Sequence, residues 1–217
     1  MNKKIAVVAA GGRVSRKVIS EAVRRGFNVT AFGRKAENMT DAQHTDAQHY
    51  VQKDILDLTA ADLAGFDAVV DGFGASTPET MPGYMTTTEH LCQILSGSPV
   101  RLLIVGGAGS LFTNKEHTAV LLEAPDFPDE FKPMATAAAE VLKAMRQRDD
   151  VKWTYVSPAA DFQADGERTG KYILGGEELT LNSRNESIIS YADYAIAMVD
   201  EIEKGHHINR RISVVGA

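Results

Sequence analysis

The sequence of 217 residues predicts a single-domain α/β fold, 1–217, built on a doubly wound parallel sheet. Three observations lead to this prediction. Short apolar segments alternate with longer amphipathic ones along the chain, as in a series of crossover connections. The first apolar segment, 5–10, is uninterrupted, which is typical of a strand buried on both faces. Several of the predicted strands end in glycine or other small residues.

The first segment leads through a glycine turn into a helix. Gly11 and Gly12 follow the strand, and the helix is expected to stop at Gly26. The apolar positions between them have the spacing of one helix face and are Val14, Val18, Ile19, Ala22 and Val23. Ala9, Gly12 and Ser15 keep the spacing of a G-x-x-G-x-x-G motif with two replacements. A strand, turn and helix of this kind open a Rossmann-type fold.

This turn is a candidate phosphate-binding site. Bound phosphate needs a tight turn, a backbone that it can approach closely, and free N–H groups at the positive end of a helix. Gly11 and Gly12 supply the first two, and the helix start at Arg13 and Val14 supplies the third. A glycine turn alone is a weak signal, because many strand–helix connections contain one.

The remaining elements follow in the same alternating order. Further strands are expected at 28–32, 49–51, 68–71, 101–105, 152–156 and 212–215, and helices at 83–95, at 134–148 and after Ser190. From Asp161 onward the pattern changes to that of a small substrate lobe, built mainly from 161–190. Within it, 172–174 and 179–181 are expected to form a hairpin. A four-residue repeat within 41–49 is interpreted as surface.

Composition narrows the class of protein. A net charge of −6 argues against a nucleic-acid-binding surface, and the apolar run after Lys4 is too short for a signal peptide or a membrane span. The single cysteine, Cys92, is expected to pack in the core of a protein kept in a reducing compartment. His206 and His207 lack further ligands at metal spacing, so no metal site is predicted. A cytoplasmic protein is expected.

Three strand ends point to one crevice. The ends are the glycine turn, Gly72-Phe73-Gly74 and Gly106-Gly107. Ligands of open parallel sheets bind outside the carboxyl ends of the strands. Ordinary turn chemistry would explain each end by itself, but their combination favours a cofactor site.

Several segments carry a resemblance to a known family. They are 4–35, Asp54-Ile55, 105–110, 124–128, 153–159, 166–170 and 189–195. With these segments the chain resembles the NAD(P)H-binding atypical short-chain dehydrogenases and, among them, bacterial proteins of the NADH-flavin reductase group. The resemblance covers nearly the whole chain. It implies that the glycine turn holds the pyrophosphate and that Asp54 and Ile55 contact adenine. It also implies that the strand ends at Gly72–Gly74 and Gly106–Gly107, with Ser157 and Pro158, complete the cofactor site.

One feature of related enzymes is missing. Tyr/Lys-dependent dehydrogenases carry Tyr-x-x-x-Lys on the helix after the fifth strand, but 132–141 contains no tyrosine. We therefore expect hydride transfer from NAD(P)H to a flavin, a quinone or a similar planar acceptor, since the cofactor itself supplies this chemistry. A nucleotide-binding redox-sensing regulator without catalysis is the alternative from another class. An epimerase or dehydratase is a third possibility.

Ser110 is the one candidate catalytic residue. It follows the fifth predicted strand, where its hydroxyl could bind a nicotinamide or substrate oxygen, although a cap or turn serine is an equal alternative. His117 lies in the long connection 111–133, a possible lid, and is a weaker candidate for a proton donor. Tyr191 and Tyr194 are expected to pack.

The residues after the second strand predict the cofactor. NAD-selective sites place an acid there for the ribose hydroxyls, whereas a 2′-phosphate needs a cation. Here the sequence is Gly33-Arg34-Lys35, Arg13 lies in the turn, and the nearest acid, Glu37, comes later. Arginine binds phosphate with two charge-assisted hydrogen bonds. NADP(H) is therefore the preferred cofactor, with NAD(H) possible; two solvated surface arginines are the alternative.

Overall fold

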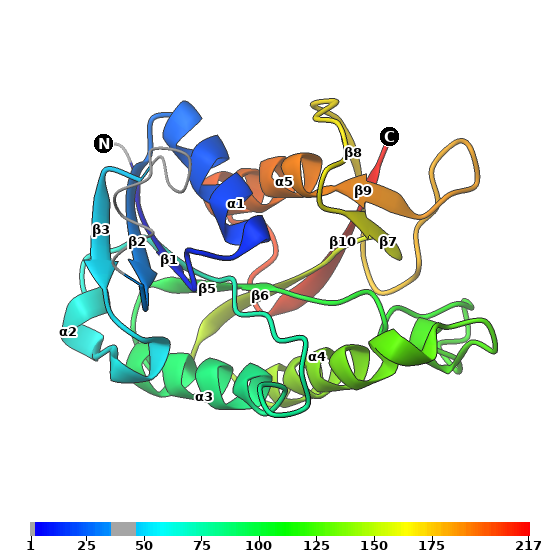
Figure 1. Cartoon of the computed structure of the whole chain (residues 1–217), viewed down its shortest axis with the longest axis horizontal. Coiled ribbons are helices and arrows are strands. Elements are labelled where there is room, and N and C mark those ends of the chain that lie inside the picture. Colours follow the sequence, from blue (N-terminus) through cyan, green and yellow to red (C-terminus); the bar gives the residue numbers. More distant parts are fainter. Residues whose placement is uncertain (1–2, 36–46) are drawn as a thin grey trace.

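A computed structural model describes residues 3–35 and 47–217 and shows one sheet between two layers of helices (Figure 1). One face is covered by α1 (Arg13–Arg24) and α5 (Tyr191–Lys204). The other is covered by α2 (Ala60–Leu63), α3 (Gly83–Leu95) and α4 (Lys132–Met145). None of these helices in the described part of the chain is long and apolar enough to cross a membrane.

The main sheet has the order β3-β2-β1-β4-β5-β6-β10-β8. Its strands are β1 (Lys4–Val8), β2 (Asn28–Gly33), β3 (His49–Gln52), β4 (Ala68–Asp71), β5 (Arg101–Val105), β6 (Lys152–Ser157), β8 (Tyr172–Gly175) and β10 (Arg210–Gly216). All neighbours pair in parallel except β8 and β10. The order of the first six strands is that of a doubly wound nucleotide-binding sheet, so the predicted fold class is confirmed. As expected, β1 lies beside β4, with Val8 opposite Asp71.

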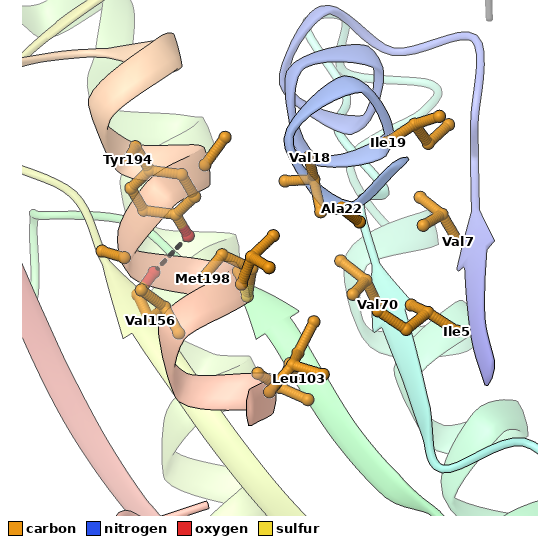
Figure 2. Packing of buried hydrophobic residues seen from close by; sticks show 14 of the residues in the cluster. Ile5, Val7, Val18, Ile19, Ala22, Val70, Leu103, Val156, Tyr194 and Met198 are labelled. Carbon is orange, nitrogen blue, oxygen red and sulfur yellow. Dashed lines mark hydrogen bonds between the residues drawn. The ribbon is translucent and has the colours of Figure 1, made fainter. Parts of the chain in front are cut away.

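Successive residues of β1 are buried on opposite faces of the sheet. Ile5 and Val7 pack with α1 and α5, while Ala6 and Val8 pack in the cluster under α3 and α4. Figure 2 shows Ile5, Val7 and Val70 facing Val18, Ile19 and Ala22 of α1. Burying a side chain such as valine or isoleucine stabilises the fold by about 1.5–3 kcal/mol. Burial on both faces explains why the strand is continuously apolar.

Helix α1 ends where the sequence indicates. Gly26 has a φ of 79°, a left-handed conformation that glycine adopts without strain. The N–H groups of Gly26 and Phe27 donate to the carbonyls of Val23 and Ala22, at 2.8 and 3.1 Å. These bonds satisfy the last turn of the helix and lead the chain into β2.

The C-terminal lobe differs from expectation. The predicted hairpin of 172–174 with 179–181 is wrong, because β8 pairs antiparallel with β10 and 179–181 belongs to no named strand. Strand β10 pairs with β6 along one edge, and its other edge is free to pair with β8. Because β10 has seven residues, it is a longer partner for β8 than the segment 179–181 would be. A separate two-stranded sheet joins β7 (Asp161–Gln163) to β9 (Ile188–Ser190) in parallel.

Other boundaries shift less. Helix α4 begins two residues before and ends three residues before the predicted 134–148, because Pro133 is well suited to the first turn of a helix. Short 3-10 helices lie at Ile55–Asp57, Leu121–Glu123 and Asp129–Phe131. Cys92 is buried, with its sulfur 3.5 Å from that of Met145. The predictions for Glu37 and for most of the 41–49 repeat fall outside the described residues.

Candidate functional site

The glycine turn forms an uncapped helix start. The N–H of Gly12 donates to the carbonyl of Ala9 at 2.9 Å, and Ala9 has a φ of 51°, so alanine here adopts a left-handed conformation that favours glycine. No side chain of the described residues caps α1 at Gly12, and its first turn, beginning at Arg13, contains no acid. The backbone N–H groups and the helix dipole therefore favour an anion at this end.

Helix α1 approaches the end of β4 very closely. A Cβ atom placed on Gly72 would lie 2.0 Å from Oγ of Ser15, and one placed on Gly12 would lie 3.6 Å from the carbonyl oxygen of Gly72. Ser15 can therefore replace the third glycine of the motif because Gly72 has no side chain. The Ser15 hydroxyl is buried and has no hydrogen-bond partner among the described residues. The turn thus combines close backbone access with unsatisfied polar groups, and fits a pyrophosphate.

A buried carboxyl group fixes the loop after β4. Oδ1 of Asp71 accepts the N–H of Phe73 at 3.0 Å, and the hydroxyl of Thr88 donates to Oδ2 at 3.2 Å. Burial raises the pKa of Asp71 to about 6. The Phe73 ring meets Tyr84 edge-on, with ring centres 5.4 Å apart. Asp71 was not among the predicted site residues, although an acid at the end of an apolar strand is a detectable signal.

A tyrosine supports the strand end at Gly106 and Gly107. The Tyr155 hydroxyl accepts the N–H of Gly107 at 3.0 Å and donates to the carbonyl of Ala138 at 2.9 Å. A Cβ atom on Gly106 would lie 2.2 Å from the Tyr155 ring. Glycine is therefore required at Gly106 by packing beneath it, a reason that the sequence analysis did not identify.

The predicted adenine-side residues lie beyond β2 and β3. Asp54 begins the 3-10 helix and accepts the N–H of Leu56 at 2.9 Å, while Ile55 is buried. The Arg34 side chain is 78% exposed, and its Nε lies 3.8 Å from Oδ2 of Asp54. A Cβ atom on Gly33 would lie 2.4 Å from the Tyr50 hydroxyl oxygen. A side chain at this position would therefore have to displace the Tyr50 hydroxyl.

Arg13 faces a different part of the molecule. Its Nη2 lies 3.2 Å from Asp165 in the C-terminal lobe, and its guanidinium lies 5.8 Å from the ring centre of Tyr191. The two arginines predicted to share one phosphate thus have different partners. Both pairs are exposed enough for the side chains to reorient.

At the end of β6, Ser157 and Pro158 are buried. The Ser157 hydroxyl has no hydrogen-bond partner among the described residues. Tyr194 of α5 is also buried and donates its hydroxyl hydrogen to the carbonyl of Val156 at 2.7 Å (Figure 2). Packing is therefore the role of Tyr194, as expected.

Ser110 and His117, the two candidate catalytic side chains, both contact residues from the C-terminal part of the chain. Nη1 of Arg211 donates to the Ser110 hydroxyl at 3.2 Å and to its carbonyl at 3.0 Å. The His117 ring stacks on Phe112, with centres 4.3 Å apart, and its Nε2 lies 2.8 Å from a Glu178 carboxylate oxygen. These contacts tie the segment after β5 to the C-terminal lobe. Within residues 3–35 and 47–217, no cluster of potential ligands could hold a metal.

Comparisons with known proteins agree with this geometry. Residues 9–204 match the family of NAD(P)H-binding proteins. The uncharacterized protein YwnB of Bacillus subtilis (strain 168) is 42% identical over 213 residues, 98% of each chain. A putative NADH-flavin reductase from Streptococcus pneumoniae TIGR4 is 48% identical with a TM-score of 0.94, and all of both chains is covered. A putative epimerase from Bacteroides thetaiotaomicron is 33% identical with a TM-score of 0.84, covering 100% of this chain and 98% of the other. The chain therefore belongs to the NAD(P)H-binding family.

Proposed function

We propose that the protein is an NAD(P)H-dependent reductase that transfers a hydride from the nicotinamide to a flavin, a quinone or a similar planar acceptor. The observation that carries the proposal is the uncapped start of α1 at Gly12, packed directly against Gly72 at the end of β4. Membership of the family supports the cofactor. The name of the Streptococcus pneumoniae relative supports a flavin as acceptor.

The proposal assigns the cofactor's parts to successive strand ends. In it, Gly11, Gly12, Arg13 and Val14 hold the pyrophosphate, while Asp54 and Ile55 border the adenine. The ribose and nicotinamide lie along Gly72, Phe73, Gly74, Gly106 and Gly107, with Ser157 and Pro158 at the far end. The register of the sheet aligns the ends of β4, β5 and β6, since Asp71 pairs with Ile104 and Val105 pairs with Val156.

The protein's part in this reaction is binding and orientation. NAD(P)H supplies the hydride, and a flavin or quinone is already an electrophilic, conjugated acceptor. Holding two rings in reacting geometry can remove a large part of the barrier. Helix α4 carries no tyrosine and the Ser110 hydroxyl is held by Arg211, so the proposal needs no Tyr/Lys pair.

The proposal includes a preference for NADP(H). Arg34 is the cation at the end of β2, and Gly33 and Lys35 beside it supply no acid of the kind that NAD-selective sites carry. The exposed Arg34 side chain can turn from Asp54 to a 2′-phosphate, where its planar guanidinium can make two hydrogen bonds. In the proposal Arg13 is a second cation for the same phosphate, a role that requires its side chain to leave Asp165.

The test is cofactor oxidation with a panel of acceptors. Purified protein is mixed with NADPH or NADH and with flavins or quinones, and the loss of reduced cofactor is followed by absorbance. The proposal predicts turnover that saturates in both substrates, with one acceptor reduced for each cofactor oxidised. Tight cofactor binding without turnover on any acceptor would instead support the redox-sensing regulator. Absence of cofactor binding would overturn both.

A further inference from the structure

A second hollow lies away from the glycine turn. It is a cavity of about 360 Å³ at the amino ends of β6 and β10, beside the last turn of α4. The cofactor crevice, in contrast, lies at the carboxyl ends of the parallel strands. Residues that line this amino-end cavity include Arg146, Trp153, Glu177, His207, Arg210 and Arg211. Its volume is in the range of small-molecule sites.

The charge of its lining is opposite to that of the whole protein. Three arginines, Arg146, Arg210 and Arg211, border the cavity with one acid, Glu177. The chain as a whole carries a net charge of −6. A concave surface with a local excess of cations attracts small anions more strongly than a flat one.

Two of these arginines, Arg146 and Arg211, donate hydrogen bonds to Glu177. Arg211 is fully buried and donates from Nε and Nη2 to Glu177, while its Nη1 bonds to Ser110. Arg146 donates from Nη2 to the same carboxylate. Arg211 therefore acts as an internal anchor for Glu177 and, through it, for Arg146. Nε and Nη1 of Arg146 have no hydrogen-bond partner among the described residues, and Arg146 borders the cavity.

The other cation lacks a counterion. Arg210 is exposed, and none of the residues 3–35 or 47–217 forms a hydrogen bond or ion pair with its side chain. His207 adds a polar group, because its Nδ1 lies 2.7 Å from Glu201 while the ring borders the cavity. An arginine without a partner, beside one fixed by a carboxylate, has the chemistry of an anion-binding pair.

We propose that the amino-end cavity binds a small organic anion through a carboxylate or phosphate group held between Arg146 and Arg210. The two guanidinium groups supply charge-assisted hydrogen bonds to the anionic group. Glu177 keeps Arg146 in place and faces the ligand as an acid, so the rest of the ligand carries hydrogen-bond donors rather than further negative charge on that side. This site is independent of the proposed function.

The chain contains a local reporter for this site. Trp153 is its single tryptophan, borders the cavity, and is held by a hydrogen bond from Nε1 to the carbonyl of Arg148 at 3.4 Å. We expect tryptophan fluorescence to change saturably when inorganic phosphate or citrate is added at constant ionic strength. Comparing the two anions distinguishes a phosphate from a carboxylate ligand, and sodium chloride serves as the salt control.

Four variants decide where the anion binds. Arg210→Gln and Arg146→Gln should each weaken the fluorescence-detected binding by about tenfold or more. Arg184→Gln removes an exposed arginine that pairs with Glu186 elsewhere and should change it by less than about twofold. Gly12→Val, at the glycine turn, should leave the anion affinity detected by fluorescence unchanged.

The proposal is overturned by any of three results. These are no saturable change with either anion, equal affinity in Arg210→Gln and the wild type, or loss of the signal in Gly12→Val alone. Arg210 has no structural partner among the described residues, so its replacement tests binding without disturbing the fold. A normal circular dichroism spectrum and thermal midpoint confirm this for each variant.

Discussion

Two buried carboxyl groups, Glu21 near the C-terminal end of α1 and Asp71 at the end of β4, have opposite environments. Burial alone would raise the pKa of Glu21, but hydrogen bonds from Arg24, Arg25 and Arg168 outweigh it and lower the pKa to about 2. Burial raises the pKa of Asp71 to about 6, because only a backbone N–H and the Thr88 hydroxyl oppose it. One group stabilises the fold, and the other costs stability.

The two carboxyl groups belong to parts of the molecule with different roles, Glu21 to the packing between elements and Asp71 to the proposed cofactor site. Glu21 joins α1 to the C-terminal lobe through Arg168, and Arg25 joins α1 to α5 through Asp200. Asp71 instead lies at the proposed cofactor site, where its Oδ1 accepts the N–H of Phe73 and fixes the chain after β4. Strongly perturbed groups gather at functional sites, where geometry is kept at the expense of stability. The C-terminal end of α1 is thus fixed by ion pairs, while no side chain of the described residues caps its first turn.

The largest effect is expected from breaking the Glu21 network. Glu21→Ala should lower the free energy of unfolding by about 3 kcal/mol, because lowering the pKa of this carboxyl from 4.5 to about 2 corresponds to that stabilisation by its three arginines. The loss should be complete above pH 4.5 and shrink as the pH falls from 4.5 toward 2, since the native carboxylate is protonated only there. Urea denaturation measures it. Glu140→Ala, in an exposed pair with Lys143, is the control, and equal losses would contradict the account.

Replacing Asp71 should change the free energy of unfolding in the opposite direction. Asp71→Asn should raise the free energy of unfolding above pH 6 by up to about 3 kcal/mol, since a shift from 3.8 to about 6 corresponds to that cost. Below pH 6 the native acid becomes protonated, so this gain should disappear between pH 6 and about 4. The pH dependence of denaturation midpoints checks it, with exposed Asp149→Asn as control. A variant that is less stable at every pH would show that ionised Asp71 stabilises the fold.

A smaller effect is expected for the cofactor preference. The wild type should bind NADPH at least tenfold more tightly than NADH, a difference of about 1.4 kcal/mol. Arg34→Ala should remove most of this difference while leaving NADH affinity nearly unchanged, because only the 2′-phosphate needs the cation. Titrations of both reduced cofactors into both proteins measure it, with Arg184→Ala as the control. Equal affinities in the wild type would refute the preference.

The smallest effect is expected at Ser110. If the reductase proposal holds, Ser110→Ala should lower turnover by less than tenfold, because its hydroxyl is held by Arg211 and no general acid is required. Removing a true general acid costs roughly 10²–10⁴-fold. His117→Ala should behave in the same way. A larger loss in kcat at either position, with cofactor affinity intact, would mean that the side chain takes part in proton transfer.

The sequence predicts best the features that depend on neighbouring residues. The strand, turn and helix up to Gly26 follow from local periodicity and small residues, and the position of β1 beside β4 follows from the handedness of crossovers. Burial of β1 on both faces was equally predictable, because a short, continuous apolar run that leads into a glycine turn is typical of a central parallel strand.

The features that the sequence did not predict depend on distant partners. Strand β8 pairs with β10 rather than with 179–181, a choice set by which sheet edge is open. Arg168 bonds to Glu21 across 147 positions, a separation at which no local pattern survives. Gly72 is predictable from its place at a strand end, but the role of the Asp71 carboxyl group in holding the loop depends on its burial and on Thr88. Charged and polar contacts between remote segments therefore make up most of what could not be predicted.

The most direct test of the account is nucleotide binding at the glycine turn, measured by calorimetric titration of NADPH into the wild type and Gly12→Val. Gly12 has a φ of −65°, which valine can adopt, but an added Cβ atom would lie 3.2 Å from the carbonyl oxygen of Ala9, so the turn must shift by a few tenths of an ångström. The valine side chain then blocks the approach of phosphate, and a thermal midpoint near that of the wild type checks that the variant folds. Gly176→Val, at a glycine with open space around it, is the matched control. We predict at least 100-fold weaker binding in Gly12→Val, about 2.7 kcal/mol, and unchanged binding in Gly176→Val. Affinity in a folded Gly12→Val within a few-fold of the wild type would contradict the account.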